Sequence, residues 1–411
     1  MGKKKVFVGL SGGVDSAVSA ALLQKFGYEV IGVFIKTWHP DFLECNEEEE
    51  RLDAMRVAAH LDIPFLTFDF EDVYKKEVAD YMISEYKKGR TPNPDVMCNK
   101  HVKFGAFLKK AIAMGADYVA TGHYAMANSG FSFFGSLSPR ARGALPLGSS
   151  ACETPKKGKP TVCLFKGVDP SKDQSYFLWT LKQEQLKRIL FPVGHLKKTE
   201  VRKLAKKFNL PVAEKHDSQG ICFLGDIDLK EFLKHYIKEK KGDVIVVPSE
   251  SEGRDKDDVI GHHNGVVFHT LGERHGFTIT KKSPTDGPYY IVGKDVKKNI
   301  LMVSQNPLPN PSPLIINGEG RRGEVIKIIN TNWIDKIPEE NKSPARNAFS
   351  IADAGGYTAQ IRYHGEFLPC QIKITGKSKA EIIFKKPVLV ASGQSVVIYD
   401  KDICLGGGVV V

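Results

Sequence analysis

A short segment near the start of the chain combines the residue types that bind phosphate. Gly9-Leu-Ser-Gly-Gly-Val-Asp-Ser16 follows an apolar run and precedes a stretch with helical periodicity. The adjacent glycines permit a tight turn and close backbone approach, and the amides of the turn and of the first helical turn converge on an anion. Ser11 and Ser16 can add hydroxyl donors, and Asp15 is expected to orient the loop or to help hold Mg²⁺. The sequence therefore predicts a phosphate-binding loop.

This loop is neither a Walker A motif, because no Gly-Lys-Ser/Thr follows, nor a GxGxxG dinucleotide loop. The string SGGVDS resembles the pyrophosphate-binding loop of the PP-loop ATP pyrophosphatases. That resemblance implies an enzyme that cleaves ATP between its α and β phosphates and adenylates a substrate oxygen. The loop alone leaves the substrate open, because the superfamily includes amide-forming synthetases as well as tRNA thiolases.

Two cysteines lie in segments suited to sulfur chemistry. Cys98 ends the Pro-rich segment 89–98 just before a predicted helix, with Lys100 and Lys103 nearby, and a helix N-terminus and cations both favour the thiolate. Cys222 follows a glycine turn and lies far from Cys98 in sequence, so only folding can bring the two together. A buried, inert thiol is the alternative interpretation of each.

The elements that must position these residues alternate in type through the first 124 residues. Alternation of strands and helices predicts an α/β fold with a doubly wound parallel sheet, in which ligands bind at the carboxyl ends of the strands. The predicted strands are 5–10, 28–35, 65–70 and 118–121, and the predicted helices are 15–26, 47–61, 71–88, 100–114, 182–190, 199–208 and 229–238.

The composition changes twice along the chain. Short β-type runs separated by Gly, Pro and Asn dominate after about residue 240, and a segment with four prolines near residue 312 reads as a linker. We therefore predict a PP-loop domain over 1–240, a small β-rich module over 241–312 that binds tRNA, and a C-terminal β-barrel over 313–411. Within the first domain, the Gly/Ser/Pro-rich stretch 129–160 reads as a flexible basic insertion.

Several motifs along nearly the whole chain resemble the tRNA-specific 2-thiouridylases (the MnmA/TrmU family), and they occur in the same order. These motifs are ATGHY at 120–124, NPDxxCN at 93–99, KDQSYFL at 172–178, DSxGICF at 217–223, and SGQ…CLGGG at 392–408. The family resemblance implies an adenine nucleotide α-hydrolase-like fold and a tRNA sulfurtransferase.

The chemistry implied by this resemblance begins with adenylation of the C2 oxygen of a wobble uridine by ATP, which releases diphosphate. Cys222 corresponds to the cysteine that carries a persulfide, and Cys98 to the nucleophile that closes a transient disulfide with it. Asp95 corresponds to a residue near the target base and is expected to act as an acid or base. The persulfide implies a sulfur-donating partner, either a cysteine desulfurase or a sulfur relay protein.

Further site residues are implied by their matching motifs. The residues expected to bind ATP are Gly9, Leu10, Ser11, Gly12, Gly13, Val14, Asp15, Ser16, Ile35 and Gly122. The residues expected to contact tRNA or its target base are Asn93, Pro94, Asp95, His123, Lys172, Asp173, Gln174, Arg362, Tyr363 and Gln394. For each of the second set, a solvated surface charge or a core side chain is the alternative.

Composition is consistent with this interpretation. Lys and Arg number 59 against 48 for Asp and Glu, a net charge of +11, which suits a polyanionic partner such as tRNA. The seven cysteines contain no CxxC pair, so no structural metal site is expected, and a reducing cytoplasm is the simplest compartment. No apolar run is long enough for a membrane span, and we expect a monomer without membrane contact.

Two departures from the family pattern and three competing functions stand beside this interpretation. The insertion 129–160 lies where the family passes quickly between motifs, and Leu271–Gly276 stands where the family tends to show a Gln and a Lys. The alternatives are an amide-forming PP-loop ligase, a tRNA-binding factor without catalysis, and an iron–sulfur thiolase.

Overall fold

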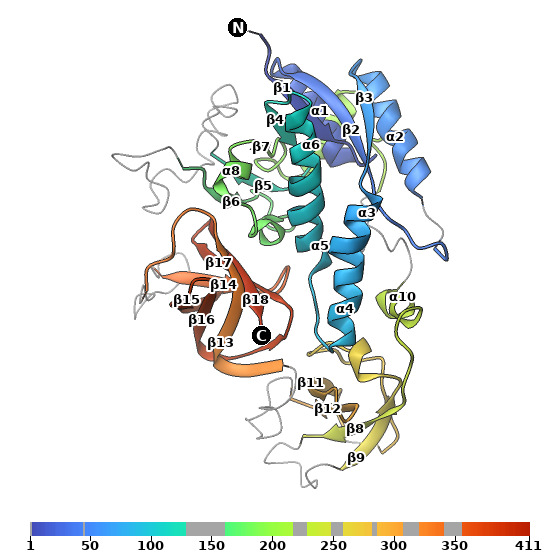
Figure 1. Cartoon of the computed structure of the whole chain (residues 1–411), viewed down its shortest axis with the longest axis vertical. Coiled ribbons are helices and arrows are strands. Elements are labelled where there is room, and N and C mark those ends of the chain that lie inside the picture. Colours follow the sequence, from blue (N-terminus) through green and yellow to red (C-terminus); the bar gives the residue numbers. More distant parts are fainter. Residues whose placement is uncertain are drawn as a thin grey trace.

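The computed structural model describes residues 2–43, 46–128, 161–216, 228–247, 258–281, 286–306, 320–340 and 356–411. The predicted insertion 129–160 and Cys222 lie outside these residues. Figure 1 shows the N-terminal sheet and its helices at the top, with the C-terminal barrel and the middle module below. In the part of the chain that is described, no helix is both long and apolar enough to span a membrane.

Five parallel strands form the N-terminal sheet in the order β3-β2-β1-β4-β7 among the described residues. Their bounds are β1 Lys5–Gly9, β2 Glu29–Lys36, β3 Phe65–Asp69, β4 Tyr118–Ala120 and β7 Ile189–Leu190. Side chains alternate across β1, so Val6 and Val8 join one buried cluster while Phe7 joins the other. The predicted doubly wound parallel sheet is therefore confirmed.

Helices cover both faces of this sheet. The face of Val6 and Val8 is covered by α1 Val14–Lys25, α2 Glu47–His60 and α9 Lys198–Lys207. The other face is covered by two long helices that each contain a π-helical section. The first comprises α3 Glu71–Tyr74, η1 Lys75–Asp80 and α4 Tyr81–Lys87, and the second comprises α5 Pro94–Met97, η2 Cys98–Phe107 and α6 Leu108–Ala113.

Three predicted helices differ from the structure, and the one predicted over 229–238 ends at Lys234. The helix predicted from residue 100 begins at Pro94, because the Asn93 side chain caps it by accepting from the Val96 amide at 3.3 Å and Pro94 suits the first helical position. The helix predicted over 182–190 is only α8 Gln183–Leu186, and the chain then enters β7. The local sequence of a short apolar pair such as Ile189–Leu190 fits a helix or a strand equally well. Pairing with β4 makes this pair a strand.

The middle module is a five-stranded sheet in the order β10-β9-β8-β12-β11, again counting described residues. Its strands are β8 Gly242–Val246, β9 Val259–His263, β10 Thr278–Ile279, β11 Tyr290–Asp295 and β12 Ile300–Ser304. β12 pairs with β8 in parallel, and the other pairings are antiparallel. Helix α10 Leu229–Lys234 precedes this sheet in the chain.

Six antiparallel strands close into the C-terminal barrel, because β13 pairs with both β16 and β18. The strands are β13 Gly320–Trp333, β14 Tyr357–Gln360, β15 Leu368–Gly376, β16 Lys379–Ala391, β17 Ser395–Asp400 and β18 Ile403–Val410. The glycines of the CLGGG motif serve this closure: a Cβ on Gly406 would lie 2.0 Å from the Asn332 carbonyl oxygen, and one on Gly407 2.3 Å from the Val396 oxygen. Only glycine fits this close strand contact.

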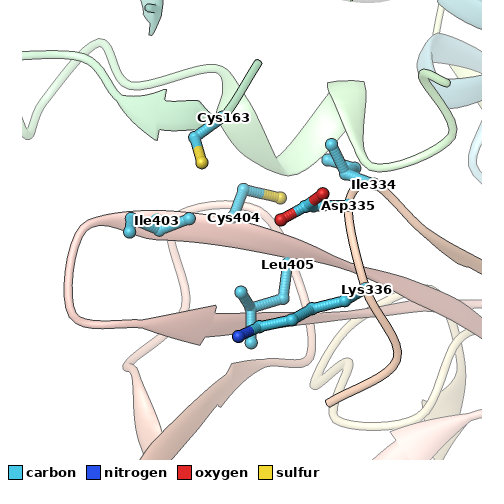
Figure 2. A pocket seen from close by; sticks show the side chains of 7 residues that line it. All are labelled: Cys163, Ile334, Asp335, Lys336, Ile403, Cys404 and Leu405. Carbon is cyan, nitrogen blue, oxygen red and sulfur yellow. The ribbon is translucent and has the colours of Figure 1, made fainter. Parts of the chain in front are cut away.

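Two short strands of the N-terminal half extend the barrel sheet, which the sequence did not predict. β5 Ala125–Ala127 and β6 Leu164–Lys166 pair with each other, and β6 pairs with β18. A small pocket lies at this junction, lined by Cys163, Ile334, Asp335, Lys336, Ile403, Cys404 and Leu405 (Figure 2). None of these residues is a predicted site residue.

A second connection runs through the helical turn η4 Ser175–Leu178. The hydroxyl of Tyr176 donates to the Ser395 carbonyl oxygen at 2.9 Å, and the Trp179 indole N–H donates to the Ser395 hydroxyl at 3.2 Å. These bonds are buried, so they fix the barrel firmly against the N-terminal half.

Candidate active site

The phosphate loop connects β1 to α1 in the conformation that its glycines permit. Gly12 has a left-handed φ of +71°, and a Cβ there would lie 2.4 Å from the Glu50 carbonyl oxygen. The Ser11 amide donates to the Ser16 hydroxyl at 3.2 Å, and that hydroxyl donates to the Gly13 carbonyl oxygen at 3.1 Å. The loop is thus held in place at the N-terminus of a 12-residue helix, where amides and helix dipole favour an anion.

Gly122 borders the same spot from the end of β4. A Cβ on Gly122 would lie 2.7 Å from the Ser16 nitrogen, so the two segments touch backbone to backbone. Leu10 and Val14 are buried in the core, and therefore only their backbone groups can meet a nucleotide. Ile35 is partly buried near the end of β2, and Gly9 ends β1.

Asp15 does not stand alone on the loop. Lys198, at the start of α9, donates to both carboxylate oxygens of Asp15 at 2.8 and 2.9 Å, and the Tyr124 hydroxyl donates to one of them at 2.8 Å. Lys198 was missed by the sequence reasoning, because it is one of many lysines between 197 and 207 and only the fold brings it to Asp15.

The second part of the site is the helix start that carries Asp95 and Cys98. Cys98 is buried one turn into the helix, where η2 begins, and not before the helix as predicted. Burial raises the pKa of Asp95, although the nearby positive charge of Lys103 opposes that rise. In contrast, burial raises the pKa of the barrel thiols Cys370 and Cys404 to about 12, so they are inert.

His123 connects the two parts through its contact with Phe104 of η2. His123 follows Gly122 and is buried with its ring 5.7 Å from that of Phe104, and the Thr121 hydroxyl lies 2.8 Å from its Nδ1. Burial lowers the pKa of His123 well below its usual range, and Lys103 lowers it further, so the imidazole is neutral. His123 therefore packs between the Gly122 segment and the helix that carries Asp95 and Cys98.

The motif Lys172–Gln174 is tied to Tyr124 by one side-chain and one backbone hydrogen bond. The Tyr124 amide donates to the Gln174 side-chain oxygen at 3.0 Å, and the Gln174 amide donates back to the Tyr124 carbonyl oxygen at 2.9 Å. Asp173 accepts from the Ser175 hydroxyl at 3.0 Å, and burial raises its pKa. Lys172 is partly buried beside them.

The barrel contributes the remaining predicted residues. Tyr363 packs against Phe177 with ring centroids 4.3 Å apart. Its pKa is raised to about 12, first by burial and then by the negative charges of Asp173 and Asp95. Arg362, beside Tyr363, is exposed.

Gln394 and Asn93 hold the segment that leads into the helix with Asp95 and Cys98. The Gln394 side chain donates to the Thr91 carbonyl oxygen at 3.1 Å, and Asn93 caps the helix that starts at Pro94. Thr91 and Lys103 are two further residues that the sequence reasoning did not single out as site residues.

Throughout the described ranges, no three His, Cys, Asp or Glu side chains gather so as to hold a metal ion. The fold and the loop define a nucleotide-binding α/β enzyme with a pyrophosphate loop and a buried cysteine close to a carboxylate.

Comparison with known proteins shows which family of nucleotide-binding α/β enzymes the chain resembles. The family model described as tRNA methyl transferase HUP domain matches residues 4–226, its PRC-barrel domain matches 230–305, and the aminomethyltransferase beta-barrel domain matches 324–410. The curated tRNA-specific 2-thiouridylase MnmA of Streptococcus thermophilus is 39% identical over 412 residues, covering 99% of this chain and 95% of that protein. The same enzyme of Bacillus subtilis is 38% identical, covering 99% and 94%.

The chain belongs to the family of tRNA-specific 2-thiouridylases. A solved 4-thiouridine synthetase in complex with RNA and ATP is 18% identical with a TM-score of 0.31, covering 56% of this chain and 50% of that one. At that score the likeness adds nothing to the assignment, which rests on the sequence relatives.

Proposed function

We propose that this protein transfers sulfur to the C2 position of the wobble uridine of tRNA and converts ATP to AMP and diphosphate. One observation carries the proposal: Gly122 touches the phosphate loop, and the next residue, His123, packs its ring against Phe104 of the helix that carries Asp95 and Cys98. A nucleotide on the loop and a base beside Asp95 would thus share one site. The family-model description mentions methyl transfer, but the full-length relatives are 2-thiouridylases, and the pyrophosphate loop suits adenylation.

In the first step, the uridine O2 attacks the α-phosphorus of ATP, the bond to the β-phosphate oxygen breaks, and diphosphate leaves. A carbonyl oxygen is a poor leaving group, and adenylation makes it a good one. The first turn of α1 and the Ser11 and Ser16 hydroxyls would hold the phosphates. Mg²⁺ bound mainly by the phosphates needs only one or two carboxylates, and Asp15 can supply one.

In the second step, the terminal sulfur of a Cys222 persulfide attacks C2, and AMP leaves with the former O2. The Cys98 thiolate then attacks the Cys222 sulfur, which breaks the S–S bond, leaves the thiocarbonyl on the base and closes a Cys98–Cys222 disulfide. A thiol reductant must open that disulfide before the next turnover. Asp95, with its raised pKa, is suited to hold the proton that the base gives up.

The exposure of each predicted side chain indicates which part of tRNA it would contact. Arg362 is exposed, unlike the other residues expected to contact tRNA, and suits a phosphate, while the half-buried Tyr363 ring suits stacking on a base. His123 is buried and neutral, so we infer that it supports the base pocket from within. A cysteine desulfurase or relay protein as sulfur donor, a monomeric state and a cytoplasmic location remain predictions.

The experiment is incubation of the purified full-length protein with ATP, Mg²⁺, a sulfide source and unmodified tRNA, followed by nucleoside analysis. We expect 2-thiouridine together with AMP and diphosphate. Cys222→Ser should make no 2-thiouridine by the persulfide route, and its unimpaired product formation would exclude that route. Absence of 2-thiouridine in a folded wild-type preparation would overturn the proposed function.

A further inference from the structure

Lys294 in strand β11 is fully buried, although lysine is seldom found inside a protein. Its ammonium donates to the His269 carbonyl oxygen at 2.8 Å and to the Gly89 carbonyl oxygen. Gly89 is 205 residues away and follows the end of α4 in the N-terminal half. A buried ammonium is costly without such partners, so this contact ties the middle module to the chain just before the catalytic helix.

Thr91, two residues after Gly89, is held by both the C-terminal barrel and the middle module. Its amide donates to the Ser392 carbonyl oxygen at 2.8 Å, and its carbonyl oxygen accepts from Gln394 at 3.1 Å. Its hydroxyl lies 3.2 Å from that of Thr270 in the middle module. Gly393, with a φ of +91°, lies so close that a Cβ there would be 3.0 Å from the Thr91 carbonyl oxygen. We call residues 89–91 with these partners the loop clamp.

The loop clamp is joined to Asp95 and Cys98 by a stiff connection. The intervening sequence is Pro92-Asn93-Pro94, in which the two prolines fix φ and restrict the residues before them. Asn93 then caps the helix. A shift at Gly89 or Thr91 therefore moves the first turn of the helix instead of being absorbed by the chain between them.

We propose that Lys294 is a positioning residue for sulfur transfer. By holding Gly89, it fixes the loop clamp and with it the place of Asp95 and Cys98. The inference rests on the proposed function for its activity test, whereas the accessibility of the Cys98 thiol gives a test that does not depend on that function.

The test compares Lys294→Met, which keeps the chain length and removes the donors, with Lys297→Met, whose exposed lysine lies on the turn after β11. In Lys294→Met we expect kcat for thiolation to fall at least about tenfold and KM for ATP to stay within about twofold, because the phosphate loop lies outside the clamp. Native-state alkylation of Cys98 with iodoacetamide, read by mass spectrometry of its peptide, should become at least about fivefold faster. Lys297→Met should match the wild type in all three measurements.

A well-folded Lys294→Met with wild-type kcat and wild-type Cys98 alkylation would overturn the proposal. So would a fall in kcat with unchanged Cys98 alkylation, because Lys294 would then act elsewhere. If Lys294→Met does not fold, Thr270→Val removes only one contact to Thr91 and should shift kcat and alkylation in the same directions by a smaller factor; unchanged values there would count against the clamp. Wild-type protein that makes no 2-thiouridine would sink the proposed function and leave the alkylation result to decide on Lys294.

Discussion

The phosphate loop and the Asp95–Cys98 segment are built in different ways. The loop is held by its own residues and by two neighbours in the N-terminal half, namely Glu50 of helix α2 and Gly122 just after β4. The catalytic segment depends on Thr270, Lys294 and Gln394, which lie between 179 and 303 residues from their partners. The proposed ATP half of the site is therefore local to one module, whereas the proposed base and sulfur half is complete only when all three modules are in place.

Cys98→Ser should separate the two halves most strongly. Thiolation should fall at least about 1,000-fold, because the attacking thiol is lost. ATP affinity, measured by calorimetry, should stay within about twofold of the wild type. Cys370→Ser is the matched control, since that thiol is buried in the barrel and should be dispensable for activity. A tenfold loss of ATP affinity in Cys98→Ser would show that the halves are not independent.

Gly122→Ala should damage the ATP half instead. The added methyl would lie 2.7 Å from the Ser16 nitrogen, where the backbone must shift. We expect KM for ATP to rise at least about tenfold and the free energy of unfolding to fall by about 1–3 kcal/mol. In Gly376→Ala, in barrel strand β15, the nearest atom would be the Lys379 Cβ at 3.8 Å, so this variant should show little change. Equal effects of the two variants in steady-state kinetics would contradict the steric argument.

Lys198→Met tests the charge network on the loop. It leaves the partly buried Asp15 carboxylate without its ion-pair partner, and the two side chains are 14% and 31% exposed. We expect KM for ATP to rise about threefold to tenfold and stability to fall by about 1–3 kcal/mol. Lys203→Met, exposed on the same helix, is the control. Calorimetry of ATP binding and urea unfolding measure the change in ATP affinity and in stability. An unchanged KM for ATP would show that Lys198 has a purely structural role.

Asp95→Asn should have the smallest effect on stability, and its sign depends on pH. Burial raises the pKa of Asp95 in the folded state above the unfolded value, so its stabilising contribution is present below the unfolded pKa and lost as pH rises through the folded pKa. The asparagine variant avoids the cost of burying the charge. The urea midpoint of Asp95→Asn should therefore rise relative to that of the wild type as pH rises from 4 to 8. A difference between the two midpoints that falls over that range would refute the interpretation.

The sequence by itself determined the phosphate loop, the parallel sheet and the family. Each is encoded locally: Gly12 and Gly13 fix the turn, and the alternation of Val6, Phe7 and Val8 fixes the faces of β1. The glycine run near the C-terminus was visible as a motif, but its reason, the closure of the barrel against Asn332, was not.

Only the tertiary structure decided which distant side chains meet. The pairing of β6 with β18, the ion pair of Lys198 with Asp15, and the reach of Lys294 to Gly89 each join residues from separate parts of the chain. The residue type alone does not show whether a lysine side chain is exposed to water or buried among carbonyl oxygens. Its role is set by the packing around it, and no short-range pattern in the sequence records that packing.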